Sequence, residues 1–205
     1  MRKAAPLRKK TSSRKTRKSQ LRDPAATEAA LLDAAEAEFN AHGFEGTDTN
    51  RIARVAGFAP QTFYRHFEDK RAVFLAVYER WWKGESAALE KSAQESPANM
   101  EAAARVALAF HTKWRGFRRA LRHLAIVDPK VRAARAAARR AQIARIRAFA
   151  GNDGRSDQDL IAALLKAERL TDAAAEGELA DLGLTPAAAK ILVIAAVAEL
   201  LGAKV

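Results

Sequence analysis

The 205-residue chain contains no cysteine, which excludes a disulfide framework, a thiolate metal site and a cysteine nucleophile. It also lacks long apolar segments. No uninterrupted apolar run exceeds about ten residues, which is well below the roughly 20 that a membrane-spanning helix needs. No apolar stretch follows Met1-Arg2-Lys3, so we expect no secretory signal and no membrane as a partner.

Sequence patterns of common enzyme sites are missing as well. There is neither a glycine-rich phosphate loop nor an HExxH metal motif in the chain. His111 and His123 are separated by about three helical turns, which is too far for two ligands of one metal ion. We therefore expect no catalytic residue, no metal and no cofactor, and we do not expect the chain to be an enzyme.

Positive charge, in contrast, is abundant and uneven. The formal net charge is +12, and residues 1–22 hold ten Lys or Arg residues and no acid. This first block has almost no apolar side chains to bury, so it is predicted to be a disordered basic arm. Such an arm binds polyanions by releasing their condensed counterions. A simple solubility tail is the alternative.

The next segment is predicted to begin with a helix from about residue 24 to residue 41. Asp23-Pro24 is a favourable start, since a capping side chain precedes a proline at the first helical position. Apolar residues then recur on one face at Leu31, Leu32, Ala35 and Phe39. Gly43 is predicted to end the helix, because glycine tolerates the positive φ that follows many helix ends.

A pair of short helices follows. Asp48 can cap a helix over Thr49–Ala56, and Gly57 breaks it. A further helix is predicted over Pro60–Phe67, and Asp69 then caps a fourth, longer helix. Two short helices joined by a tight, glycine-containing turn are typical of a helix-turn-helix motif.

Polar side chains around the third helix suit a DNA contact. The candidates are Arg51, Gln61, Thr62, Tyr64, His66 and Lys70. Gln61 lies in the first turn, where a recognition helix meets base edges, and glutamine can pair with adenine. The hydroxyl and imidazole groups suit phosphate oxygens. Lys70 begins the next helix, whose free N–H groups also favour an anion. We interpret Phe63 and Phe67 as core residues.

This segment resembles the N-terminal domain of TetR-type transcriptional regulators over roughly residues 25–80. The resemblance rests on Gly43-Phe44-Glu45-Gly46-Thr47, Ile52-Ala53, Ala56-Gly57 and Thr62-Phe63-Tyr64-Arg65-His66-Phe67 with Lys70. It implies that Thr62, Tyr64, His66 and Lys70 hold the phosphate backbone and that Gln61 lies near the bases. Ala59 departs from the family's frequent serine or threonine cap. Asp48 replaces a frequent threonine, so Thr47 is the expected phosphate contact at the helix entrance.

The resemblance also implies a fold and an organisation. An all-α protein is predicted, with a disordered basic arm at residues 1–22 and a three-helix helix-turn-helix DNA-binding domain at residues 23–70. A helical effector-binding and dimerisation domain is predicted at residues 71–205. The family pairs its last two long helices with those of a second copy, so a homodimer is expected.

The pattern of the second domain stays helical. Apolar residues form one continuous stripe from Ala103 to Leu121, and Asp128-Pro129 ends this segment and opens the next, which runs to about Ala150. Another helix is predicted around Leu160. A last helix begins at Thr185-Pro186 and is apolar nearly all round, so it must be buried on several sides. The sequence pattern does not assign residues 171–184, for which we suggest a short extra helix.

Arginines of the second domain allow two interpretations. Arg115, Arg118, Arg119 and Arg122 share one helix face, and Arg132, Arg135 and Arg139 share another. They are either two solvated surfaces or the site of an anionic effector, such as a fatty acyl thioester. The candidate ligand contacts are Trp82, Phe110, Trp114, Phe117 and Arg118, although the aromatic residues of the stripe are also core candidates. Trp81 and Trp82 are adjacent and cannot face the same way.

These patterns predict a ligand-responsive transcriptional repressor with a helix-turn-helix motif. We expect it to bind an inverted-repeat operator in double-stranded DNA as a homodimer formed through its C-terminal helices. A small-molecule effector would release it. Such a protein would be cytoplasmic and associated with the nucleoid. The alternative is an effector-independent architectural or nucleoid DNA-binding protein.

Overall fold

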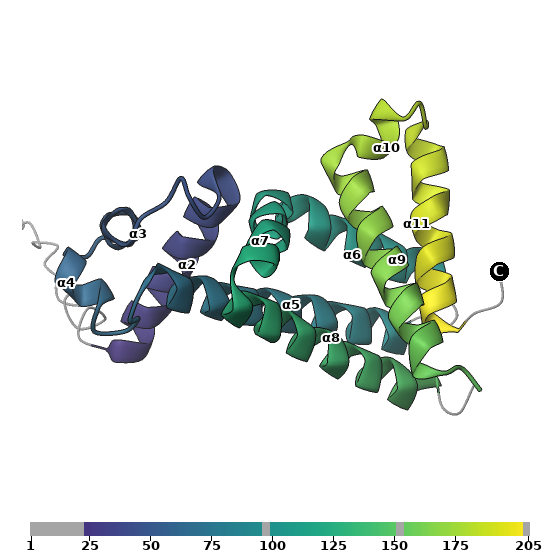
Figure 1. Ribbon diagram of the computed structural model, residues 1–205, viewed down its shortest axis with the longest axis horizontal. Helices are drawn as coiled ribbons and strands as arrows, with labels where there is room; N and C mark the ends of the chain where they lie inside the picture. The colour runs from purple at the N-terminus through teal and green to yellow at the C-terminus, as the bar shows by residue number, and fades with distance from the viewer. Residues whose placement is uncertain (1–22, 96–98, 151–153, 203–205) are drawn as a thin grey trace, which may run out of the picture.

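The computed structural model describes residues 23–95, 99–150 and 154–202. The described residues form helices without any strand, which confirms the all-α prediction. A small three-helix domain lies at one end, and a larger helical domain lies at the other (Figure 1). The long helix α5, Lys70–Glu95, runs from the first domain into the second. The predicted basic arm, residues 1–22, is outside the described residues.

The small domain comprises α2 (Pro24–His42), α3 (Thr49–Val55) and α4 (Pro60–Phe63). Its helix starts are as predicted, since the side chain of Asp23 accepts from Ala25 N–H and that of Asp48 from Arg51 N–H. Gly43 ends α2 at a φ of 70°, where a side chain would be strained.

The expected extent of the third helix is wrong. α4 ends at Phe63 instead of Phe67, and tight turns follow it. In these turns His66 N–H donates to the carbonyl oxygen of Phe63 at 2.9 Å. The turns bring the ring of Phe67 to 5.6 Å from that of Phe63, and both side chains are buried as predicted. Phe67 N–H also donates to the carbonyl oxygen of Phe63 at 2.9 Å, so Phe67 stays close to α4 although the regular helix has ended.

The single helical stripe expected between Ala103 and Leu121 is also divided. α6 (Met100–Lys113) ends at Trp114, and α7 (Arg115–Val127) begins directly after it in a new direction. The reason lies in the first turn of α7. A Cβ on Gly116 would stand 1.9 Å from the backbone carbonyl oxygen of Asn40. Glycine at this position therefore allows α7 to pack directly on the end of α2.

The side chain of Asn40, on α2 of the small domain, forms hydrogen bonds with both α6 and α7 where these two helices meet. Its Nδ2 donates to the carbonyl oxygen of Lys113 at 2.7 Å. Its Oδ1 accepts from the N–H groups of Gly116 and Phe117 at 3.1 and 3.2 Å. One amide thus satisfies the end of α6 and the beginning of α7, whose backbone groups lack helical partners. The small domain is thereby joined to the break between two helices of the large domain.

The rest of the large domain consists of α8 (Pro129–Ala150), α9 (Asp157–Glu176), α10 (Glu178–Asp181) and α11 (Pro186–Leu201). Asp128 and Thr185 cap α8 and α11 as predicted. The unassigned segment divides between the end of α9 and α10, a short helix between the two longer ones. α8 lies along α5, and α9 and α11 stand side by side at the far end (Figure 1). Within the described ranges, no helix has the length and apolarity needed to cross a membrane.

The described residues contain three separate apolar clusters. The largest extends from Leu31 in the small domain through Phe74 and Phe117 to Val131, so the two domains share one core. A second joins α8, α9 and α11, and a third joins α6 and α11. Trp81, Leu164 and Val197, one from each cluster, all line a cavity between them.

Candidate DNA-binding surface and ligand cavity

The turn between α3 and α4 gives the small domain its helix-turn-helix geometry. Gly57 has a φ of 82°, and Phe58 N–H donates to the carbonyl oxygen of Ala53 at 2.9 Å. Ala59 precedes α4 without a side-chain cap, as its identity predicts. In the first turn of α4, Pro60 has no N–H group and Thr62 N–H donates to the carbonyl oxygen of Ala59 at 2.9 Å, and the side chain of Gln61 is exposed.

The predicted DNA contacts fall into two groups. Gln61 and Tyr64 are exposed and Thr62 is half-buried. The Tyr64 hydroxyl lies 2.8 Å from Thr49 Oγ1, and this hydrogen bond joins α4 to α3. Exposed side chains that a hydrogen bond orients are well suited to meet phosphates in a fixed register.

The other predicted contacts are engaged inside the domain. Thr47 is buried, and its hydroxyl donates to the carbonyl oxygen of Glu38 at 3.3 Å. The Lys70 ammonium group donates to the carbonyl oxygens of Phe44 and Thr47 at 2.8 and 3.0 Å. It also lies 4.1 Å above the centre of the Phe44 ring. Lys70 therefore holds together the loop that leads into α3.

Arg51 and His66 have carboxylate neighbours. Arg51 forms an ion pair with Glu38 and a hydrogen bond of 2.7 Å with His42 Nε2. His66 Nδ1 lies 3.9 Å from a carboxylate oxygen of Glu28, and its side chain is 12% exposed. These neighbours reduce the positive charge that either residue can offer to a phosphate.

Two exposed arginines complete the surface, and neither is among the predicted contacts. Arg54 is on α3 and Arg65 follows α4, and the guanidinium of neither has an ion pair or hydrogen bond with another described residue. An arginine with free donors is well suited to phosphate oxygens. The exposure of Arg65 does not follow from the sequence pattern, because α4 was expected to end four residues later, at Phe67.

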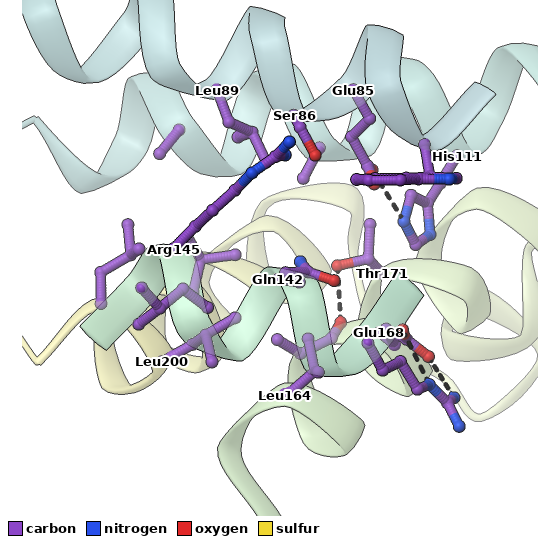
Figure 2. Close-up of a pocket in the computed structure, with 18 of the residues that line it drawn as sticks. Glu85, Ser86, Leu89, His111, Gln142, Arg145, Leu164, Glu168, Thr171 and Leu200 are labelled. Carbon is purple, nitrogen blue, oxygen red and sulfur yellow. Dashed lines mark hydrogen bonds and ion pairs between the residues drawn. The ribbon is translucent and has the colours of Figure 1, made fainter. Parts of the chain in front are cut away.

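A second candidate site is the cavity inside the large domain. Its volume is about 170 Å³, and its wall consists of α5, α6, α8, α9 and α11 with Arg118 and Leu121 of α7. Leu89, Leu164 and Leu200 supply apolar wall on different helices (Figure 2). Trp82 of α5 and Arg145 of α8 meet across the wall, with the guanidinium 5.1 Å from the ring centre. Largely apolar pockets with a few polar groups are typical of small-molecule sites.

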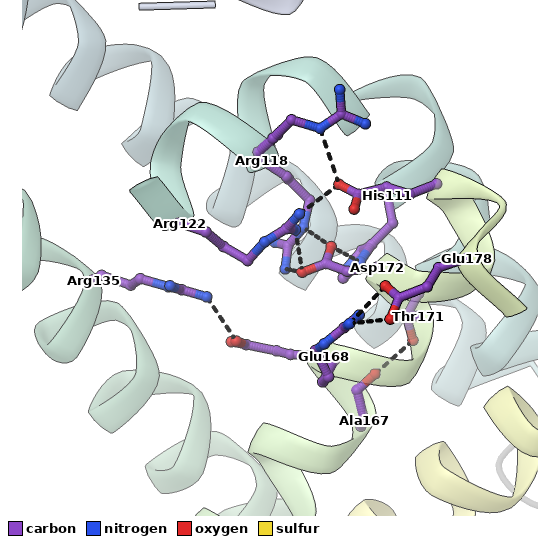
Figure 3. A network of polar contacts seen from close by, with 12 residues as sticks. His111, Arg118, Arg122, Arg135, Ala167, Glu168, Thr171, Asp172 and Glu178 are labelled. Carbon is purple, nitrogen blue, oxygen red and sulfur yellow. Dashed lines mark hydrogen bonds and ion pairs between the residues drawn. The ribbon is translucent and has the colours of Figure 1, made fainter. Parts of the chain in front are cut away.

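Buried charges lie next to the cavity in a connected network (Figure 3). The guanidinium of Arg118 donates twice to Asp172, at 2.5 and 3.0 Å, and both side chains are 3% exposed. Arg122 Nη1 lies 2.7 Å from Asp172 Oδ2, the oxygen that also accepts from Arg118 Nη2. Burial by itself raises the pKa of Asp172, but hydrogen bonds from His111 and Arg118 outweigh it and lower the pKa below the ordinary range. Asp172 is therefore a buried, fully paired carboxylate.

His111 extends this network toward the cavity. Its Nδ1 is 2.8 Å from Asp172 and its Nε2 is 3.2 Å from Glu85, a second buried carboxylate. The Arg118 guanidinium lies 4.6 Å from the centre of the Trp81 ring. Separate helices thus contribute to one polar cluster that leaves each buried charge beside an opposite charge.

A second cluster joins α8 to α9. Arg135 and Arg139 both bind Glu168, with Arg139 Nε at 3.2 Å and Arg135 Nη2 at 3.3 Å from its carboxylate. Burial raises the pKa of Glu168, whereas the two arginines and Arg118 lower it by a larger amount. The interpretation of these arginine faces as solvated is therefore wrong for Arg118, Arg135 and Arg139, although it holds for the exposed Arg115 and Arg119.

The predicted ligand contacts do not gather at the cavity. Trp82 and Arg118 line it. Trp114 and Phe117 are buried in the largest apolar cluster, and Phe110 packs against that cluster. Trp81 is buried and Trp82 is half-buried, which agrees with the prediction that these adjacent side chains face different ways. The cavity is also lined by three residues that were not predicted, namely Glu85, Ser86 and Gln142, because polar residues on long helices carry no spacing signal that marks a cavity.

The structure thus combines a helix-turn-helix motif in the small domain with an internal cavity in the large domain. Residues 31–77 match the sequence model of the family described as bacterial regulatory proteins, tetR family. The matched residues lie in the small domain and the beginning of α5, so the match concerns about a quarter of the chain.

One individual protein is also similar to this chain over a short span. The chain is similar to a helix-turn-helix transcriptional repressor from Streptomyces coelicolor, with 41% identity over 59 residues. That match spans 29% of this chain and 31% of the repressor, so it is confined to about a third of the relative's length.

Two solved structures share the whole fold. One, from Rhodococcus sp., is assigned to the TetR-family regulators and has a TM-score of 0.66 at 18% identity, over 85% of this chain and 98% of the other. The second, assigned as a transcriptional regulator from Pseudomonas aeruginosa PAO1, has a TM-score of 0.62 at 21% identity, over 93% and 97%. At these identities the likeness concerns the fold alone.

Proposed function

We propose that the protein is a ligand-responsive transcriptional repressor that binds an inverted-repeat operator as a homodimer. The observation that carries the proposal is the α3–α4 motif, which presents Gln61, Tyr64 and two unpaired arginines on one small domain. Gln61 would read a base edge from the major groove. Arg54, Arg65 and Tyr64 would hold the phosphates. Such a regulator would act in the cytoplasm, on the chromosome.

Apolar side chains on α9 and α11 support the homodimer. Ile161 and Leu165 of α9 are 45% and 43% exposed, and Ile191 and Leu192 of α11 are 65% and 40% exposed. A second copy would cover these side chains, because exposed apolar surface of this kind favours association. Two recognition motifs could then address half-sites about one DNA turn, ~34 Å, apart.

The junction at Asn40 supports a response to a ligand. α6 and α7 both contribute to the cavity wall, through His111 and Arg118, and their break is capped by Asn40 of the DNA-binding domain. A ligand that prefers one arrangement of α6 and α7 would therefore also select one position of α2. Its effect on DNA affinity would equal its differential affinity for the two states.

The experiment is a selection of fragmented genomic DNA by the purified full chain at ~150 mM salt, where binding through the backbone alone is weakened. A few sites that share an inverted repeat would support the proposal. Broad enrichment without a common sequence would contradict it and favour the architectural or nucleoid alternative.

The contribution of the basic arm needs a matched variant that lacks residues 1–22. If recognition lies in α4, removing the arm should lower the salt dependence of binding by several counterions and preserve the sequence preference. Loss of the preference together with the arm would show that recognition lies outside the helix-turn-helix motif.

A further inference from the structure

The charged side chains around the cavity already have partners within the protein. Arg118 is bound to Asp172, and both Arg135 and Arg139 are bound to Glu168. These pairs involve neighbouring helices and are at least largely buried. An anionic headgroup could recruit one of these arginines only by displacing its carboxylate. Removing one partner of a buried ion pair is strongly unfavourable, since it leaves an uncompensated charge.

A cationic ligand meets the same obstacle. Glu85 is the buried carboxylate on the cavity wall that has no arginine partner, and its Oε1 is 3.2 Å from His111 Nε2. The stacking of Arg145 on Trp82 and that of Arg118 on Trp81 already place a cation against each tryptophan of the wall. A further positive charge would therefore enter a wall that already carries four arginines.

Among the described residues, three uncharged polar side chains of the wall are free, in contrast, and they belong to Ser86, Ser92 and Gln142. Ser86 on α5 and Gln142 on α8 line the cavity from different helices (Figure 2). Neither forms a hydrogen bond with any residue in the part of the chain that the structure describes. A hydroxyl and an amide together offer both donors and acceptors. They can satisfy one uncharged polar group of a ligand without disturbing any ion pair.

The dimensions of the cavity limit the size of the ligand. Its volume of about 170 Å³ is close to the ~150 Å³ of an apolar cavity that accommodates benzene. Most of the remaining wall is apolar, with Leu89, Leu164 and Leu200 on three helices. An apolar ligand body of about one ring, or a short alkyl chain, can therefore replace empty space with contacts.

We propose that the cavity binds a small uncharged molecule with an apolar body and one hydroxyl, carbonyl or amide group. The polar group meets Ser86 and Gln142, and the body lies against Leu89, Leu164 and Leu200. This assignment rests on the proposed function for its biological meaning, because it names the class of effector that would act on the repressor. It replaces the anionic effector that the arginine content suggested.

The test is a binding series on the full chain in which charge alone changes. Benzyl alcohol and benzamide are compared with benzoate and benzylamine, and 1-hexanol with hexanoate and hexylamine, by isothermal titration calorimetry at pH 7. The neutral members should bind at least ~10-fold more tightly than the charged members of the same size. Gln142→Leu should weaken binding of the neutral members about 3- to 10-fold, the range expected for one lost hydrogen bond.

Gln94→Leu is the matched control, because Gln94 is an exposed glutamine on α5 that does not line the cavity. It should leave every affinity unchanged. Tighter binding of benzoate or benzylamine, no saturable binding of any neutral member, or an unchanged affinity in Gln142→Leu would overturn the assignment. Operator binding is measured separately on the protein without ligand. The proposed repressor and the proposed ligand class can therefore fail independently.

Discussion

Arginine has two different roles in the two domains of this protein. In the helix-turn-helix domain, Arg54 and Arg65 are exposed and have no partner among the described residues. In the large domain, Arg118 is buried against Asp172, and Arg139 is bound to Glu168. Both domains contain arginine, but the arginines that line the cavity of the large domain have their charge engaged within the protein.

The arginines of α7 and α8 are paired because acidic residues of a single helix, α9, lie opposite them. Glu168, Asp172 and Glu176 recur every four residues and so share one face of α9. Arg118 and Arg122 have the same spacing on α7, and Arg135 and Arg139 have it on α8. The faces meet in the fold, as the ion pairs show (Figure 3). Net charge alone is therefore a poor guide to where an anion binds, because partners can be far away in sequence.

The largest expected effect comes from breaking the buried pair. Asp172→Asn removes the charge that compensates Arg118 and should lower the free energy of unfolding by about 3–5 kcal/mol, measured by urea denaturation. The double variant Arg118→Leu with Asp172→Leu should recover a substantial part, because neither side chain then leaves a buried charge. A loss below ~1 kcal/mol in Asp172→Asn would mean that the large domain does not depend on this pairing.

Tyr78 tests the same packed region at high pH. Burial raises the pKa of Tyr78 to about 12, whereas an unfolded tyrosine has a pKa near 10. Its contribution is thus fully present below about pH 10 and is lost as pH rises toward 12, at ~1.4 kcal/mol per pH unit. Tyr78→Phe should remove this part of the pH dependence. Identical slopes for the two proteins in urea denaturation between pH 10 and 12 would contradict the burial of the phenol.

Gly116→Ala tests the contact between the domains. Because the new Cβ would lie 1.9 Å from the Asn40 carbonyl oxygen, α2 and α7 must separate, at a cost of about 1–3 kcal/mol typical of overpacking. The cost is measured by thermal denaturation. Gly84→Ala is the matched control, since its Cβ would meet Phe110 at an ordinary 3.6 Å. Equal effects of the two substitutions would show that the junction is not closely packed.

Substitutions of Gln61 and Arg54 test the role of the exposed side chains in the helix-turn-helix domain. Gln61→Ala should reduce discrimination at one base pair of each half-site by about 1–3 kcal/mol, measured by competition between single-base operator variants. Arg54→Ala should instead weaken all sequences alike and reduce the salt dependence by about one counterion. The reverse pattern would interchange the roles of these two residues.

The smallest expected effect concerns Thr47, whose hydroxyl is used inside the domain. Thr47→Val should lower the free energy of unfolding by about 1 kcal/mol, the usual value of one hydrogen bond. It should leave the salt dependence of DNA binding unchanged, as measured by titrations at several salt concentrations. A reduced salt dependence would show that Thr47 contacts a phosphate despite its burial.

Much of the fold could be predicted, because helix boundaries here depend on local chemistry. Asp23-Pro24, Asp48, Asp69 and Thr185-Pro186 supply caps or first-turn prolines, and each begins a helix as expected. The helix-turn-helix motif followed from the same local signals. Its exposed residues at Gln61 and Tyr64 were identified as well, since a short motif fixes which side faces out.

The failures have a common physical cause in contacts between distant segments. The break at Trp114 depends on the packing of Gly116 on Asn40, 76 residues away. An isolated glycine within a helical pattern was the available signal. The placement of Phe117 in the core instead of the cavity depends on how α7 lies on α2 and α5.

The sequence by itself determined the helices, their caps, the DNA-binding motif and the excess of positive charge, because these follow from residues within a few positions of each other. Only the tertiary structure decided which charges remain free. It paired the arginines of α7 and α8 with the acids of α9, and it left Ser86 and Gln142 unpaired on the cavity wall. Burying a charge is favourable only beside an opposite charge, and that neighbour is supplied by the packing of helices.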